Sequence, residues 1–253
     1  MIQPKISVVT VCYNAINDIE KTILSVINQT YSNIEYLIID GGSTDGTMDI
    51  IKKYKDKIDV IVSEPDKGIY DAMNKGIEKA SGVFINFMNA GDTFADNSVV
   101  KNIFEQIPLN RDVKLIFGPW YLVYNGHERL IKPSPFFKNT KKVRGMGFSH
   151  QTVFLDAALA KKYKFENKKF KIAADYNMIN SIYISQNVQT FEIAFPIAKM
   201  DDSDGATINN FRLHLLEDAK ICGFDNYYSP LHLNFLLFVQ RIKRLIKHYI
   251  YSL

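Results

Sequence analysis

Cysteine is scarce in this chain of 253 residues, which has Cys12 and Cys222 and no other. Two cysteines so far apart provide neither a disulfide framework nor a zinc cluster, so we expect reduced thiols in a cytoplasmic protein. The N-terminus lacks the long apolar region and small-residue cleavage site of a signal peptide. No segment offers the roughly 18 uninterrupted apolar residues of a transmembrane helix.

A basic surface spread along the chain is also lacking. The 31 basic residues exceed the 27 acidic residues by four. All four extra cations lie after residue 230, where there is no acid, so the rest of the chain is neutral. A nucleic-acid-binding protein normally distributes a basic face over its folded body. We therefore expect no nucleic-acid partner.

The composition that is present is typical of a globular domain, with 47% hydrophobic and 23% charged residues. Runs at 6–11, 34–39, 60–62 and 83–88 are apolar at both parities, which predicts strands buried on both faces. Between them, residues 18–29, 47–57 and 69–79 show helical spacing. This alternation predicts an α/β fold whose Rossmann-like, mostly parallel central sheet is flanked by helices.

The second half of the chain has a looser pattern. Residues 97–107 favour a helix, and 114–117, 121–124 and 129–131 favour strands around a hairpin turn at Asn125-Gly126. We expect these strands to be antiparallel additions to the same sheet. Further along, 151–155 favours a strand, and 156–163, 175–185 and 231–251 favour helices.

Polar residues follow each of the first four predicted strands, in the segments 13–14, 40–46, 63–68 and 89–92. Ligands of open α/β sheets bind beyond the carboxyl ends of the strands, so we expect a polar ligand or a metal there. Two phosphate-binding motifs are excluded. Ser43 takes the second glycine position of G-x-G-x-x-G, and Thr47 stands where a P-loop needs its lysine.

Four segments together carry a family resemblance: 7–14, 39–47, 64–76 and 89–92, which read SVVTVCYN, IDGGSTDGT, EPDKGIYDAMNKG and NAGD. In this order and spacing they resemble the family 2 glycosyltransferases of the GT-A fold, of the type that acts in bacterial polysaccharide biosynthesis. The match continues more loosely through 149–151 and 173–176. It implies inverting transfer of a sugar from a UDP- or dTDP-type donor to a hydroxyl of a glycan or lipid-linked glycan.

The resemblance also implies residues that contact the donor. Asp40 would accept the imide N–H of uracil or thymine, with the segment 10–14 as the wall beside the base, and Asp66 would contact the nucleoside. For Asp40, Asp45 and Asp66, capping of a turn or helix is the alternative. The predicted donor-binding residues are Thr10, Tyr13, Asn14, Asp40, Asp66, Asn74, Asn89 and Asp92.

The segment 89–92 occupies the position of the family's D-x-D metal motif but has lost most of its acids. Asp92 is the carboxylate left for Mg²⁺ or Mn²⁺, with His150 or a later histidine as a further ligand. Such an ion would stabilise the charge of the nucleoside-diphosphate leaving group. The alternative is that Asp92 caps a helix and that Lys67, Arg144 or Arg212 neutralises the phosphates.

Transfer to a hydroxyl requires a base that removes the acceptor's proton. Asp175 follows Ala173-Ala174, precedes a predicted helix, and matches the acidic residue that is the base in inverting members of the family. Capping of that helix is compatible with this role. His150 and Gln151 are predicted to line the phosphate or acceptor side, and the alternative for His150 is a structural role. The acids Asp201, Asp202 and Asp204, with Gly205, resemble a closing loop and favour a solvated turn.

We expect a GT-A domain over 1–225, with a nucleotide-sugar half at 1–100 and an acceptor half at 101–225. A basic amphipathic helix follows over 226–253. It predicts either a peripheral contact with anionic lipid at the inner face of the plasma membrane or packing on protein. A non-catalytic nucleotide-sugar-binding module, suggested by the depleted D-x-D position, is the main alternative function. A sugar nucleotidyltransferase is disfavoured, since no glycine-rich basic loop follows the first strand.

Overall fold

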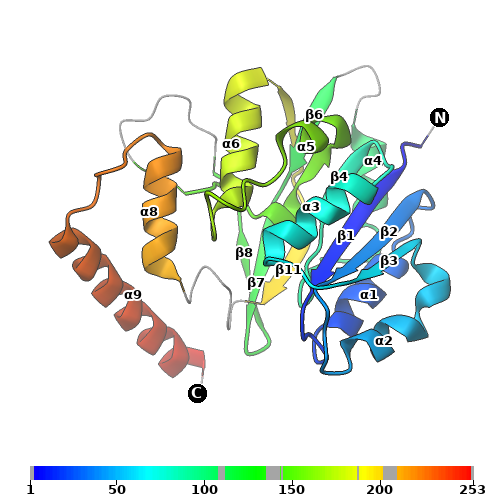
Figure 1. Ribbon diagram of the computed structural model, residues 1–253, viewed down its shortest axis with the longest axis horizontal. Coiled ribbons are helices and arrows are strands. Elements are labelled where there is room, and N and C mark those ends of the chain that lie inside the picture. The colour runs from blue at the N-terminus through cyan, green and yellow to red at the C-terminus, as the bar shows by residue number, and fades with distance from the viewer. Residues whose placement is uncertain are drawn as a thin grey trace.

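Two β-sheets form the framework of the molecule (Figure 1). The computed structural model describes residues 3–107, 112–134, 143, 145–186, 188–201 and 210–251. The larger sheet contains β1 (Ile6–Cys12), β2 (Ile34–Asp40), β3 (Val60–Ser63), β4 (Phe84–Phe87), β6 (Val113–Phe117), β9 (Phe154–Asp156) and β10 (Gln189–Glu192). The smaller sheet contains β5 (Thr93–Phe94), β7 (Trp120–Tyr124), β8 (His127–Ile131) and β11 (Ala198–Asp201).

The larger sheet has the order β10-β6-β9-β4-β1-β2-β3. Strand β1 pairs in parallel with β2, from Ile6 opposite Ile34 to Cys12 opposite Asp40, and in parallel with β4 on its other side. The chain therefore winds outward from β1 to β3 and then reverses to β4. In such sheets the ligand crevice lies where the direction reverses, which here is the carboxyl end of β1 and β4.

Helices cover both faces of this sheet, as the sequence predicts (Figure 1). One face packs against α1 (Ile19–Ile27), α2 (Thr47–Lys53) and α4 (Val99–Gln106), and the 3-10 helix η1 (Lys55–Lys57) follows α2. The other face packs against α3 (Ile69–Lys79), α5 (Ala157–Tyr163) and α6 (Ala174–Gln186). Alternate residues of β1 supply the two cores, because successive side chains of a strand point to opposite faces.

The contact between α3 and β1 is unusually close at one point. A Cβ at Gly76 would lie 2.5 Å from Cγ1 of Val9, so only glycine allows this approach. The close packing fixes α3 against β1, and the loop at 64–68 leads into the N-terminal end of this helix.

The structure corrects three expectations about strands. The hairpin β7–β8 belongs to the second sheet, in which β11 pairs in parallel with β7, and it does not extend the first. Strand β3 is a half-exposed edge strand, so it is not buried on both faces. The predicted strand at 151–155 is a 3-10 helix, η2 (His150–Thr152), followed by the short β9. Strands β5, β10 and β11 were not predicted.

The C-terminal part contains α8 (Phe211–Ile221), which was not predicted, and α9 (Pro230–Tyr251), which was. Helix α9 lies at the outside of the molecule against α8 (Figure 1). Its apolar stripe faces outward, with Leu231 83%, Phe235 61% and Phe238 59% exposed. Within the described residues, no helix combines the length and the hydropathy needed to cross a membrane. No disulfide joins Cys12 to Cys222.

Candidate active site

Two adjoining cavities lie at the carboxyl end of β1 and β4. The small cavity, of about 430 Å³, is bounded by the segments that follow β1 and β3. The large cavity, of about 630 Å³, extends from the segment after β4 to η2, α6 and the strands β7 and β11 of the second sheet. The two cavities share Asp18, Ile69, Asn89 and Ala90 in their walls, so one extended ligand can occupy both.

Asp66, like Asp18, lies on the wall of the small cavity. Its Oδ1 accepts a hydrogen bond from the backbone N–H of Gly68 at 2.7 Å. A Cβ at Gly41 would lie 2.5 Å from Asp66 Oδ2 and 3.3 Å from the Tyr13 ring, so the carboxylate fills the space that a side chain at 41 would take. Among the described residues, no donor reaches Oδ2. This oxygen can therefore accept a hydrogen bond from a ligand.

Tyr13 and Asn14 form another part of the small cavity's wall. The Tyr13 side chain is 65% exposed, which leaves its ring available for stacking on a flat ligand. Asn14 has a φ of 47°, a left-handed conformation that asparagine tolerates better than most residues. Its Oδ1 accepts from the N–H of Thr44, and its N–H donates to the Ser43 hydroxyl, so Asn14 ties together the loops after β1 and β2.

Three predicted donor-binding residues do not lie on the wall of either cavity. Thr10 is fully buried in β1, on the face of the sheet that packs on α1, and hydrogen-bonds with the Tyr36 hydroxyl at 3.0 Å. Asn74 grips the backbone of Phe165, with Nδ2 donating to its carbonyl and Oδ1 accepting from its N–H, both at 2.9 Å. Both side chains are thus taken up by structural contacts, and their part in donor binding stays a prediction.

Asp40 is the third of these residues. It is fully buried, and its carboxylate accepts from the N–H groups of Gly42 and Ser43 and from the Ser63 hydroxyl. Burial alone would raise the pKa of this carboxyl, but these hydrogen bonds lower it below the ordinary value. Asp40 thus shapes the turn after β2, and the structure favours the capping alternative. Asp45 is similar, since it accepts from the N–H groups of Thr47 and Ile16.

Asp92 lies on the wall of the large cavity and is only 9% exposed. Its Oδ2 accepts from Nε2 of Gln151 at 2.6 Å. Burial raises the pKa of Asp92 to about 6, against the effect of the Gln151 hydrogen bond. The helix-cap alternative is wrong, because Asp96 accepts from the N–H of Ser98 where α4 begins.

A divalent cation fits Asp92 only in part. A cation would favour the charged form of a carboxylate that burial destabilises. Within the described part of the chain, however, no three His, Cys, Asp or Glu residues group in a way that could hold a metal. His150 is not available as a ligand, because both of its ring nitrogens already have partners. The remaining ligands would therefore be phosphate oxygens of a bound substrate and water.

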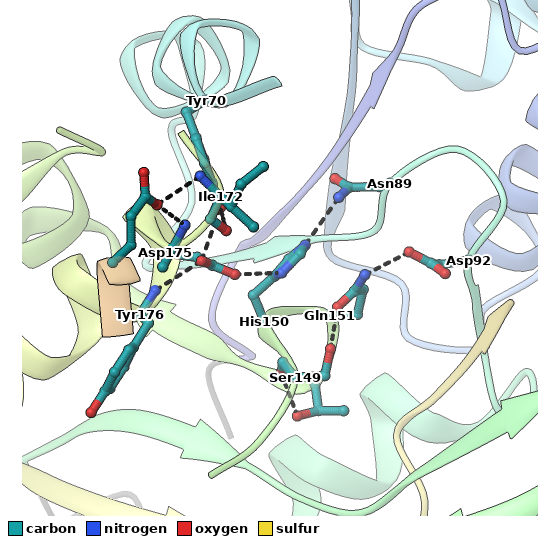
Figure 2. A network of polar contacts seen from close by, with 12 residues as sticks. Tyr70, Asn89, Asp92, Ser149, His150, Gln151, Ile172, Asp175 and Tyr176 are labelled. Carbon is teal, nitrogen blue, oxygen red and sulfur yellow. Dashed lines mark hydrogen bonds and ion pairs between the residues drawn. The ribbon is translucent and has the colours of Figure 1, made fainter. Parts of the chain in front are cut away.

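Asp175 and His150 form the centre of a polar network in the large cavity (Figure 2). His150 Nδ1 lies 3.0 Å from Asp175 Oδ2, and His150 Nε2 lies 3.0 Å from Nδ2 of Asn89. Asp175 Oδ1 accepts from the N–H of Tyr176 at 2.9 Å and from the Tyr70 hydroxyl at 3.0 Å. Burial raises the pKa of Asp175, but these bonds, His150 foremost, bring it below the ordinary value. Asp175 is thus an ionised carboxylate at the cavity wall, with 13% of its side chain exposed.

The structure brings together most of the predicted residues. Gln151 joins η2 to Asp92, and its own Oε1 accepts from the Ser149 hydroxyl. Lys67 and Arg212 are exposed and line neither cavity, whereas Arg144, Asp202 and Asp204 lie outside the described residues. Asp201 is the last residue of β11 and lines the large cavity, so the prediction of a solvated turn is wrong at this residue. The predicted residues on the cavity walls are Tyr13, Asn14, Asp66, Asn89, Asp92, His150, Gln151 and Asp175.

Sequence reasoning missed Tyr70 and three residues of α8. Glu217 accepts the N–H groups of residues 171, 172 and 173 and so holds the chain just before Asp175. His214 lines the large cavity and lies 3.4 Å from the buried carboxylate of Asp218. Burial raises the pKa of Asp218 to about 7, and Asp175 and Glu217 add to this. No motif marks α8, which follows the part of the chain where the resemblance ends.

Comparison with known proteins gives a family and a fold. The sequence model described as "Glycosyl transferase family 2" matches residues 7–168. The Escherichia coli UDP-Glc:alpha-D-GlcNAc-diphosphoundecaprenol beta-1,3-glucosyltransferase WfgD is 27% identical over 229 residues, which are 89% of this chain and 88% of WfgD. Staphylococcus aureus TarS 1–349 in complex with UDP-GlcNAc superposes with a TM-score of 0.67 at 20% identity, over 90% of this chain and 69% of that one.

A second solved structure that is similar to this chain contains a metal. The Pyrobaculum calidifontis mannosyltransferase PcManGT, in complex with GDP-Man and Mn²⁺, has a TM-score of 0.64 at 14% identity. The superposition covers 92% of this chain and 69% of PcManGT. At such low identity, these two likenesses show a shared fold.

Proposed function

Because this chain belongs to glycosyltransferase family 2 and has the GT-A fold of these enzymes, we propose that it transfers a sugar from a UDP- or dTDP-sugar to a hydroxyl of a lipid-linked glycan, with inversion. That it is a glycosyltransferase follows from the family. The donor, the acceptor and the stereochemistry are our proposal. Family membership favours this function over a non-catalytic binding module or a nucleotidyltransferase.

One observation carries the proposal. The small cavity, with a free acceptor oxygen on Asp66, opens into a large cavity with an ionised carboxylate, Asp175. A nucleotide sugar needs such a pair of connected sites, one for the base and one where its sugar meets the acceptor. We assign residues 1–100 mainly to the donor and 101–225 mainly to the acceptor. The large cavity draws on both halves.

In this proposal Asp66 replaces Asp40 as the residue that reads the base. Its Oδ2 would accept the imide N–H of uracil or thymine, while the Tyr13 ring lies against the base. Asn14 and Gly41 keep the wall in shape. A carboxylate that accepts from an imide N–H discriminates against cytosine, whose corresponding nitrogen is itself an acceptor.

Asp92 would hold Mg²⁺ or Mn²⁺ together with the donor's diphosphate. When bound, such an ion supplies positive charge to the leaving diphosphate. PcManGT, which contains Mn²⁺, supports a divalent cation in this fold. Gln151 keeps the Asp92 carboxylate in place through its 2.6 Å hydrogen bond.

Asp175 would act as the general base. It takes the proton of the acceptor hydroxyl as the oxygen attacks the anomeric carbon from the side opposite the diphosphate, which inverts that carbon. Trp120 and Leu122 of the second sheet form an apolar part of the same wall, on which the flat face of an acceptor sugar can pack. His214 would present a polar group to its hydroxyls.

The function is tested with the full chain and a panel of UDP- and dTDP-sugars. We expect release of nucleoside diphosphate when Mn²⁺ and a GlcNAc-diphospholipid are present, and a β-linked product from an α-linked donor in the proton NMR spectrum. The acceptor follows from WfgD, whose name contains GlcNAc-diphosphoundecaprenol. An α-linked product would overturn inversion, and no release from any donor would overturn the donor class.

Helix α9 supports a lipid-linked acceptor at the cytoplasmic face of the membrane. It carries no acid, its Arg241 and Lys243 are exposed, and its apolar stripe is uncovered in the single chain. A basic amphipathic helix of this kind binds anionic lipid, with about 1 kcal/mol for each cation near the surface.

This membrane contact has a direct test. The double variant Arg241→Glu and Lys243→Glu should lose sedimentation with phosphatidylglycerol vesicles, whereas the matched change of Lys55 and Lys57 to Glu in η1 should not. Equal sedimentation of both variants would show that α9 packs on protein instead.

A further inference from the structure

One imidazole ring connects the two cavities. His150 has Nε2 3.0 Å from the amide Nδ2 of Asn89, a residue shared by both walls, and Nδ1 3.0 Å from Oδ2 of Asp175. The ring is 18% exposed and the Asp175 side chain 13% exposed. Water therefore competes little with these two contacts, and the protons on the ring are set by the two neighbours.

The chemistry of the neighbours decides where the proton sits. An ionised carboxylate only accepts hydrogen bonds, so the contact with Asp175 needs a proton on Nδ1. A neutral imidazole with a proton on Nδ1 has a lone pair on Nε2, and this lone pair needs a donor. The amide of Asn89 supplies it through Nδ2. Both ring nitrogens of His150 are then paired without any added charge, while Oδ1 of Asn89 is buried with no partner among the described residues.

We propose that Asn89 and His150 are positioning residues for the base: the amide of Asn89 holds His150 in its Nδ1–H tautomer, and this N–H orients the carboxylate of Asp175 toward the acceptor. The inference rests on the proposed function, in which Asp175 removes the acceptor's proton. His150 itself transfers no proton and touches no reacting atom.

This role gives a physical reason for the unusual residue at 89. An aspartate at 89 would place a carboxylate next to Nε2 of His150. In the neutral Nδ1–H tautomer Nε2 carries a lone pair and no proton, so two acceptors would face each other. The ring would gain a second proton and become a cation between two carboxylates, an arrangement that opposite charges stabilise. That cation would favour the ionised form of Asp175 and so weaken it as a base. Asparagine at 89 therefore keeps the His150 ring neutral, whereas an acid at this position would favour its protonation.

Other charged and titratable groups surround His150 and Asp175. The variants used in the test leave all of these groups in place. Tyr70 of α3 shares its hydroxyl between Asp175 Oδ1 at 3.0 Å and the carbonyl of Ile172 at 2.6 Å. The others lie on α1's leading segment, the loop after β4, the chain before α6, β11 and α8: Asp18, Asp92, Lys171, Asp201, His214, Glu217 and Asp218. Variants are therefore compared with one another at each pH.

The tautomer is measured directly in the full chain by long-range proton–nitrogen NMR with ¹⁵N-labelled histidine. The signals of His150 are those that disappear in His150→Asn. At pH 7.5 we expect a protonated Nδ1 and an unprotonated Nε2, and two protonated nitrogens in Asn89→Asp. The exposed Asn97→Asp is the control and should leave the wild-type spectrum. A wild-type Nε2–H tautomer, or an unchanged ring in Asn89→Asp, would overturn the proposal.

Kinetics separate positioning from a merely structural role. The amide nitrogen of asparagine at 150 can replace Nδ1–H, whereas leucine cannot donate. We expect kcat to fall about tenfold or more in His150→Leu and to recover in part in His150→Asn, while the donor KM stays within about twofold in both. The acid limb of the kcat profile should move to higher pH in His150→Leu, since the hydrogen bond that lowers the pKa of Asp175 is lost.

Equal loss in both variants, or a loss confined to donor KM, would overturn the proposal. His127→Asn in β8, an exposed histidine, is the matched control for the substitution itself. Failure of the proposed function looks different. In that case the wild-type chain would transfer no sugar, while the NMR measurement would still report the tautomer of His150.

Discussion

Acids near the two cavities differ in how many hydrogen bonds they accept from the chain. Near the small cavity, Asp40 and Asp45 accept several N–H and hydroxyl donors, and their pKa values are lowered. At the large cavity, burial raises the pKa to about 6 for Asp92 and about 7 for Asp218, whereas the hydrogen bonds of Asp175 bring its pKa below the ordinary value. Asp40 and Asp45 thus shape loops, while the large cavity combines acids that burial destabilises with one that hydrogen bonds keep ionised.

The largest expected effect is the loss of turnover when the proposed base, Asp175, is changed. Asp175→Asn removes the proton acceptor but keeps a side chain of the same shape, so kcat should fall by about 10² to 10⁴. Binding of UDP, followed by thermal shift, should be unchanged, because the small cavity is untouched. Turnover within about tenfold of wild type would mean that another group is the base.

A change in the small cavity should affect the donor instead. Gly41→Ala places a Cβ 2.5 Å from Asp66 Oδ2 and must displace the carboxylate. We expect the donor KM to rise about tenfold, the equivalent of one lost hydrogen bond to a charged group, with kcat little changed.

Gly145→Ala is the matched variant in the large cavity, where the new Cβ would lie 3.1 Å from Asp218 Oδ2. Its effect should appear in the acceptor KM. If both alanine variants changed the same KM, the division of the site into donor and acceptor cavities would be wrong.

The two cavities also differ in how much of their walls could be predicted from the sequence. The strands β1 to β4 and the helices between them follow from local apolar periodicity. Residues just after β1, β3 and β4 fall on the cavity walls because parallel strands end at one edge. The hairpin β7–β8 was predicted as strands, but its sheet was not, since periodicity does not identify the partner strand. Strand β5 has two residues, too few for any pattern.

The site residues also divide into those that local sequence marks and those that only tertiary contacts place. Asp66, Asp92 and Asp175 could be found from their place after strands or before a helix. Thr10 and Asn74 lie off the cavity walls, which no local pattern indicates, because their partners, Tyr36 and Phe165, are 26 and 91 residues away in the chain. Residues of α8 reach the large cavity only through tertiary packing, so their sequence gives no signal.

A smaller effect is expected when Asp92 is changed to asparagine: the stability of the protein should increase while its activity decreases. Asp92→Asn removes a buried charge while its amide oxygen can still accept from Gln151. The ligand-free protein should become more stable at pH 7.5, by on the order of 1 to 2 kcal/mol, while transfer falls. Thermal unfolding without donor and metal measures the first effect. A lower melting temperature would contradict the account of a charge destabilised by burial.

The smallest predicted effect is the pH dependence of stability. Asp92 and Asp218 have raised pKa values when folded, about 6 and about 7, against 3.8 when exposed, so the folded chain binds more protons in between. Stability should therefore rise as the pH falls from 8 to about 5.5. Carboxyls with lowered pKa values, such as Glu35 at about 2, oppose this only below about pH 4.5. His214, whose pKa burial lowers from 6.5, opposes it below about pH 6.5, so the rise should be steepest above that pH. Asp218→Asn should flatten the rise in denaturant titrations, and an unchanged slope would contradict it.

The place of β9 has a consequence for how the chain is made. This strand of three residues lies between β4 and β6, antiparallel to both, although it comes almost seventy residues after β4 in the chain. On the ribosome, a nascent chain has finished β4 and β6 well before residue 156 leaves the exit tunnel. Until then both strands carry an unpaired edge, of the kind that recruits chaperones and other strands. Synthesis of the segment that ends in β9 is thus the moment at which the growing sheet becomes continuous.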